Sequence, residues 1–144
     1  MTVRDSEKAR ELLHAGEYTC ALCRGNEHYT STLRGVRPLV EWLESGNDLR
    51  GFSAADKVVG KGAAFLYVLL GVQSVYSHVI SIPALEVLHS HGITVEYDTL
   101  VEHIINRRGD GFCPFEVAVM DIADADTAYR AIRKKMEEMN IANS

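Results

Sequence analysis

The stretch Asp56–Leu70 reads DKVVGKGAAFLYVLL and joins a short β-type run to an apolar segment without a polar face. Its first part predicts a strand near Ala54–Val59, because paired valines favour extended backbone. Its second part predicts a helix over Lys61–Leu70 that ends at Gly71. A helix that is apolar all round is expected to be buried, and helices packed on both faces of a sheet would explain this one.

After this stretch, strand and helix patterns alternate. Val72–Ile80 reads as a strand, and Ser81-Ile82-Pro83 opens a helix with a Ser N-cap candidate and a Pro in the first turn. Gly92 ends that helix before a strand at Ile93–Tyr97. Strand, helix, strand, helix, strand predicts parallel pairing with right-handed crossovers.

The chain before this stretch predicts a helix, a β-hairpin and a second helix. The first helix and the second one each have apolar residues at helical spacing, and Gly25-Asn26 lies between two β-rich runs. The expected elements are a helix at Asp5–Ala15, hairpin strands at Tyr18–Cys23 and His28–Leu33, and a helix with the stripe Val36, Leu39, Val40 and Leu43.

The last third of the chain predicts helices. One apolar stripe precedes the turn Arg107–Gly111, a second belongs to the terminal helix, and Cys113-Pro114-Phe115-Glu116 reads as a helix start between them. The two stripes are Leu100, Val101, Ile104 and Ile105, and then Ala125, Ala128, Tyr129, Ile132 and Met136. We therefore expect one domain over residues 1–144, a three-layer α/β/α sandwich with a mixed sheet of about five strands.

Composition and charge argue against several classes of function. A net charge of −5 in 144 residues gives no electrostatic footprint for duplex nucleic acid or an anionic membrane. The first residues carry charge instead of the apolar core of a signal peptide, and the longest apolar run, Ala63–Leu70, is too short to cross a bilayer. We expect a cytoplasmic protein whose three cysteines, Cys20, Cys23 and Cys113, are reduced thiols.

Gly60-Lys61-Gly62 is a candidate anion site but not a P-loop. A P-loop needs a Gly where Ala55 stands and a Ser or Thr where Gly62 stands. A helix start still presents unpaired N–H groups, glycines permit close approach, and Lys61 adds a positive charge, which together suit a phosphate or carboxylate. In the alternative interpretation the glycines only serve a tight strand-to-helix turn and Lys61 is a solvated end residue.

The cysteines predict no metal site. Cys20 and Cys23 have the spacing of half a zinc site, but no second pair follows, and residues three apart on a strand point to opposite faces. Cys113 sits at a helix mouth after Arg107-Arg108, where positive potential could lower its pKa and make it nucleophilic. The alternative is a small capping residue beside a structural proline.

The order of elements resembles the cytidine deaminase-like fold. That fold opens two helices with a His/Cys-x-Glu motif and a Pro-Cys-x-x-Cys motif, which together hold zinc. Here the first helix start offers Gly60-Lys61-Gly62, and in the second Pro83 remains while Ala84 and Val87 stand where thiolates would be. The resemblance therefore implies the fold without the zinc and without its hydrolytic water.

More closely, the segments DKVVGKGAAFLYVLLGV, VISIPALEVLHSHGI and IINRRGDGFCPFE, with the terminal helix, look like a small prokaryotic domain-of-unknown-function family. That family has this fold and lacks the zinc motifs. The resemblance covers most of the chain and implies no established reaction. Its signature residues are Asp56, Gly60, Lys61, Ala63, Ser81, Asn106, Arg107, Cys113, Pro114 and Glu116, which the edge of an open α/β sheet would bring together.

Three functions follow as hypotheses. The first is a zinc-free binding domain for a phosphate-bearing ligand, such as a nucleotide or an ADP-ribose-like compound, at the Lys61 helix start. The second is a non-metal transferase that uses Cys113 or Asp56, and the third is a structural or interaction module, possibly a homo-oligomer. No cofactor or metal is expected. The candidate ligand residues are Gly60, Lys61, Gly62, Ser81, Asn106, Arg107 and Glu116.

Overall fold

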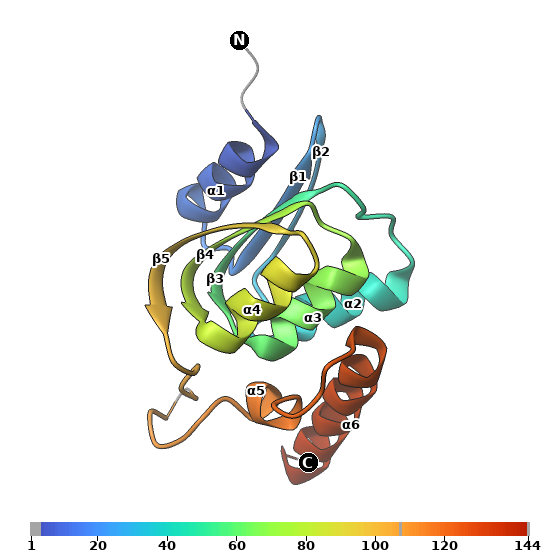
Figure 1. The fold of residues 1–144 in the computed structure, drawn as a ribbon. Coiled ribbons are helices and arrows are strands. Elements are labelled where there is room, and N and C mark those ends of the chain that lie inside the picture. Colours follow the sequence, from blue (N-terminus) through green and yellow to red (C-terminus); the bar gives the residue numbers. More distant parts are fainter. Residues whose placement is uncertain (1–3, 107, 144) are drawn as a thin grey trace.

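The computed structural model describes residues 4–106 and 108–143, with the side chains described up to residue 140, so Arg107 lies outside the described residues. Helices and strands alternate along most of the chain (Figure 1). The elements are α1 (Asp5–Ala15), β1 (Cys20–Arg24), β2 (Glu27–Ser31), α2 (Arg37–Ser45), β3 (Ser53–Val59), α3 (Lys61–Leu70), β4 (Ser74–Ser81), α4 (Ile82–Ser90), β5 (Thr94–Val101), α5 (Pro114–Ala118) and α6 (Ala125–Asn143).

The five strands form one mixed sheet in the order β2-β1-β3-β4-β5. β1 runs antiparallel to both of its neighbours, whereas β3, β4 and β5 are parallel. The predicted mixed sheet, its hairpin and the parallel crossovers are confirmed. Because β3, β4 and β5 run the same way, their carboxyl ends meet at one edge of the sheet, which we call the carboxyl edge.

Helices cover both faces of the sheet and give the predicted α/β/α layers. On one face α1 buries Ala9 and Leu13 in a cluster with Cys23 and side chains of β3 and β4. On the other face α2, α3 and α4 cover the larger cluster, which includes Cys20. The two cysteines of β1 therefore lie on opposite faces, as residues three apart on a strand must.

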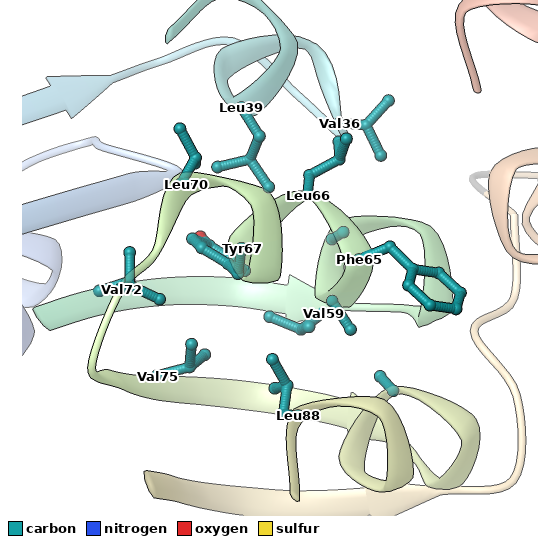
Figure 2. Close-up of a cluster of buried hydrophobic side chains, with 14 of the residues drawn as sticks. Val36, Leu39, Val59, Phe65, Leu66, Tyr67, Leu70, Val72, Val75 and Leu88 are labelled. Atoms are coloured by element: carbon teal, nitrogen blue, oxygen red, sulfur yellow. The ribbon is translucent and has the colours of Figure 1, made fainter. Parts of the chain in front are cut away.

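α3 is the central helix of the larger core (Figure 2). Its side chains Phe65, Leu66 and Tyr67 are almost fully buried. α2 and α4 flank α3, and α5 and α6 also pack against it. The predicted burial of α3 is confirmed. The expected cause was the packing of helices on both faces of the sheet, but α3 is buried by the other helices on its own face.

The predicted helix across Leu100–Ile105 is wrong. β5 continues to Val101 in register with β4, and Ile105 then forms an isolated bridge with Phe112. Pairing with β4 satisfies the backbone groups on the inner side of β5 up to Val101, and this tertiary gain overrides the helical spacing of the apolar residues. The start of α5 at Pro114 and the terminal helix α6 are confirmed. Within the described residues, none of the helices combines the length and the apolar character that crossing a membrane requires.

Candidate functional site

Two helices begin side by side at the carboxyl edge. α3 starts directly after β3, with Gly60 at its N-cap, and α4 starts directly after β4, with Ser81 at its N-cap. The Ser81 hydroxyl accepts a hydrogen bond from the Ala84 N–H (3.2 Å), so its predicted capping role is confirmed. Gly60 has no side chain to cap α3, and the first N–H groups of that helix need an acceptor from elsewhere.

Glu116 of α5 supplies that acceptor. Its Oε2 accepts hydrogen bonds from the Lys61 N–H (2.7 Å) and from the Ser81 hydroxyl (2.5 Å). Its Oε1 accepts one from the Ile104 N–H (2.8 Å). The Glu116 side chain is fully buried. A carboxylate of the protein itself therefore lies where the positive ends of two helices would favour an anion.

The two glycines permit the close approach of α5. Neither has a positive φ, so backbone freedom does not explain them. A Cβ on Gly60 would lie 3.1 Å from both Glu116 Oε2 and Ile104 Cγ1, and one on Gly62 would lie 3.2 Å from the Phe115 carbonyl oxygen. These positions require glycine because the chain's own α5 segment packs against the start of α3.

The Lys61 side chain also has a partner within the chain. Its Nζ donates to the Met120 carbonyl oxygen (2.6 Å), between α5 and α6. The same ammonium lies 5.8 Å from the centre of the Phe65 ring. Lys61 is half-buried. The interpretation of this residue as a freely solvated helix end is wrong, and its backbone and side chain both help to hold the segment that carries Glu116.

His103 belongs to the site, although sequence reasoning did not select it. Its Nδ1 lies 3.6 Å from Glu116 Oε1, and this buried atom has no hydrogen-bond partner in the described residues. Its ring packs 5.0 Å from the Phe112 ring. His103 lies in the segment that was predicted as a helix, so no spacing in the sequence could have related it to Glu116.

The loop residues stand apart from this cluster. Asn106 closes a turn, because its Oδ1 accepts from the Gly109 N–H (2.9 Å) and its Nδ2 donates to Asp110 (2.9 Å). Arg107 lies outside the described residues. Of the predicted ligand residues, the structure brings together Gly60, Lys61, Gly62, Ser81 and Glu116, while Asn106 uses its side chain within its own turn.

Cys113 precedes α5 at the N-cap position. Its thiol makes no capping hydrogen bond, and its N–H donates to the Ile104 carbonyl (2.8 Å). The side chain is half-buried. The predicted position at the cap beside Pro114 is confirmed, but the cap is formed by the backbone: the Cys113 carbonyl accepts from the Val117 N–H (3.1 Å), and its N–H joins Ile104 to the start of α5.

Asp56 lies in the core beneath α3, apart from the helix starts. Its Oδ2 accepts a hydrogen bond from the Tyr67 hydroxyl (2.7 Å), which is also 3.1 Å from Cys20 Sγ. Burial raises the pKa of Asp56 to about 6, although the hydrogen bond from Tyr67 opposes this shift. Burial and the neighbouring Asp56 also raise the pKa of the Cys20 thiol, so this thiol stays protonated. Asp56 is 8% exposed and lies in the core, and its use as a catalytic residue stays a prediction.

No metal centre is found among the described residues, which contain no group of three or more His, Cys, Asp or Glu that could hold an ion. At the start of α4, Ala84 and Val87 are buried apolar residues. The fold and the site thus define a class: a mixed-sheet α/β protein whose two helix starts are bridged by an internal carboxylate.

Comparisons with known proteins show the family of this chain. The chain belongs to the family described as Domain of unknown function (DUF1893), whose model matches residues 8–136. It is similar to the crystal structure of a DUF1893 family protein, TM1506, from Thermotoga maritima, with 25% identity and a TM-score of 0.84 over 94% of this chain and 92% of that one. The family predicted from the sequence is confirmed.

A more distant structure is a diaminohydroxyphosphoribosylaminopyrimidine deaminase/5-amino-6-(5-phosphoribosylamino)uracil reductase from Thermotoga maritima. The identity is 17% and the TM-score 0.41, over 80% of this chain and 40% of that chain. None of the curated proteins matches the sequence.

Proposed function

We propose that this protein is an interaction module that binds a partner protein at its carboxyl edge. The observation that carries the proposal is the Glu116 carboxylate, which already occupies the positive ends of α3 and α4. A small anion at the same N–H groups would have to displace a buried, hydrogen-bonded side chain. Partner binding at the surrounding surface needs no such displacement.

Several segments at and next to the carboxyl edge carry exposed apolar side chains. Of the eight large apolar side chains that are exposed in the described residues, six belong to segments at or next to the carboxyl edge, and one of the six, Leu100, lies on β5. Exposed apolar side chains that gather in one region commonly mark a binding surface. We call the five that lie outside β5 the apolar rim: Val58, Ile82, Ile105, Phe112 and Val117.

Phe112 is the central residue of this proposal. The residue is 52% exposed, its ring packs on His103, and its backbone pairs with Ile105. A ring that is fixed on one side and open to solvent on the other loses little conformational freedom when a partner covers it. The bridge therefore presents two neighbouring apolar side chains from a fixed backbone.

Photo-crosslinking tests the proposal. Benzoylphenylalanine at position 112 should give a discrete crosslinked product in an extract of the source organism, and Val117→Asp in the same protein should remove it. The same group at Leu33, an exposed apolar residue outside the rim, is the control. Equal products from both positions, or no product at position 112, would refute the rim as a binding surface.

The phosphate-ligand hypothesis remains the second candidate. Two helix N-termini and the Lys61 ammonium lie close together, which is a favourable electrostatic setting for a nucleotide or an ADP-ribose-like compound. In this case the ligand would compete with Glu116. A saturable rise of the thermal midpoint with one such compound, lost in Lys61→Ala, would support the hypothesis, and a panel without any shift would remove it.

A further inference from the structure

β5 forms the edge of the sheet and has an open outer side (Figure 1). Within the described part of the chain, β5 pairs with β4 alone. Its eight residues, TVEYDTLV, contain no Pro or Lys, two common protections of an edge strand, and the charged residues that they do contain are both acidic, Glu96 and Asp98. The outer backbone groups of β5 are therefore a template on which another strand can pair.

The two faces of β5 differ in character. Val95 packs on the core on the α4 side, so Tyr97 and Thr99 lie on that side as well. Glu96 and Asp98 lie on the α1 side, where Arg10 approaches both carboxylates at 3.7 Å. Two carboxylates thus share one guanidinium, and the α1 side of this edge keeps an excess of negative charge.

Asp98 also accepts hydrogen bonds from its neighbours on β4. The Tyr76 hydroxyl donates to its Oδ2 (2.5 Å), and His78 Nδ1 lies 2.9 Å from the same oxygen. These contacts lower the pKa of Asp98, the hydrogen bond with His78 having the largest effect. The carboxylate is fixed in position while its side chain remains 39% exposed.

A second copy of β5 fits this edge poorly. If two copies of β5 pair antiparallel about a two-fold axis, residues that point to the same face lie opposite each other. Two such registers pair most of the strand, one with the axis at Tyr97 and one with the axis at Asp98. The first sets Glu96 against Asp98 of the other copy, and the second sets Asp98 against itself. Like charges directly opposite each other destabilise a sheet, and the two acidic residues therefore work against self-pairing.

We propose that the β5 edge binds an extended segment of another protein in which basic and apolar residues alternate. Lysines or arginines at every second position would lie beside Glu96 and Asp98 on the α1 side. The intervening apolar residues would pack on Tyr97 and Thr99 on the α4 side, with backbone hydrogen bonds supplying affinity. This edge is separate from the apolar rim, so the crosslinking result at Phe112 does not decide it.

A synthetic peptide tests the inference on the full chain. The probe is a seven-residue peptide of alternating Lys and Val, with two controls: alternating Glu and Val, and the same Lys and Val residues grouped in two blocks. We expect the alternating Lys peptide to shift the backbone amide NMR signals of Thr94–Val101, with an affinity that falls as salt rises.

A charge reversal provides the matched variant. Glu96→Lys should weaken the alternating Lys peptide by about tenfold, because a cross-strand attraction becomes a repulsion. Glu41→Lys, an exposed residue of α2, should leave the affinity unchanged. The inference fails if either control peptide binds equally well, if the shifted signals lie outside β5, or if the two variants weaken binding to the same extent.

Discussion

At the scale of single residues, Asp56 places a carboxyl group in the core under α3. Its pKa of about 6, against an ordinary value of 3.8, means that the folded chain holds the proton more tightly than the unfolded chain. The resulting stabilisation is complete below about pH 4 and is lost as the pH rises through 6. Two pKa units correspond to about 2–3 kcal/mol of unfolding free energy.

Asp56→Asn should remove this dependence, because the amide oxygen can still accept from Tyr67 and carries no charge. The measurement is urea denaturation of both proteins from pH 4 to 8. The difference between their unfolding free energies at each pH gives the contribution of Asp56. Asp124→Asn is the control of opposite sign, since the Asp124 pKa is lowered by the Thr127 N–H and its stabilisation is lost as the pH falls. Parallel curves for Asp56→Asn and the unmodified protein would contradict the prediction.

A substitution at Gly60 tests why this position requires glycine: because α5 approaches it closely or because its backbone needs conformational freedom. Gly60→Ala should lower the unfolding free energy by about 1–3 kcal/mol, because the new methyl group meets Glu116 Oε2 and Ile104 Cγ1 at 3.1 Å. Gly111→Ala is the matched control, since its nearest contact is an Asn106 amide nitrogen at 3.4 Å. Equal midpoints in chemical denaturation for the two variants would show that a Cβ at position 60 can be accommodated and that close approach does not select glycine there.

At the scale of elements, Glu116 joins α5 to α3, to α4 and to the segment before the Ile105 bridge. Glu116→Gln keeps the shape and removes the charge. We expect it to cost about 2–4 kcal/mol of unfolding free energy, because several donors lose a charged acceptor inside the protein. Amide hydrogen exchange should accelerate at Lys61 and Ile104, whose N–H groups bond this carboxylate.

Glu86→Gln on the exposed side of α4 is the control for that substitution, and it should change neither stability nor exchange. If Glu116→Gln exchanges as slowly as the unmodified chain, the carboxylate is not what holds the helix starts. The Glu116 carboxylate would then contribute little to stability, and a phosphate could displace it more easily, which would favour the phosphate-ligand hypothesis.

At the scale of the whole molecule, α6 returns to cover α3 and completes the larger core. Ile132 is fully buried there, and Ala128 one turn earlier is buried with it. The exposed ion pair between Arg133 and Glu44 joins α6 to α2 but contributes little by itself. Apolar burial is therefore what fixes the last helix to the rest of the chain.

Ile132→Ala should cost about 2–5 kcal/mol, because it leaves a cavity between α6 and α3. Ile82→Ala, at an exposed apolar residue, should change the unfolding free energy by less than about 0.5 kcal/mol. Calorimetry of both variants gives the comparison. A small effect at Ile132 would mean that α6 packs more loosely than the described contacts indicate.

The alternation of elements and the helix over Lys61–Leu70 could be predicted from the sequence alone, because they depend on local periodicity and on turn residues. The family could be predicted too, but from the resemblance of several segments to that family and not from periodicity. The sequence also predicted that Ser81 caps a helix and that Cys20 and Cys23 point to opposite faces of a strand, and both predictions are confirmed. Only the tertiary structure decided that Glu116 fills the start of α3, since the two partners lie 55 residues apart. It also decided that Leu100 and Val101 belong to a strand, because pairing with β4 stabilises extended backbone over a stripe that has helical spacing.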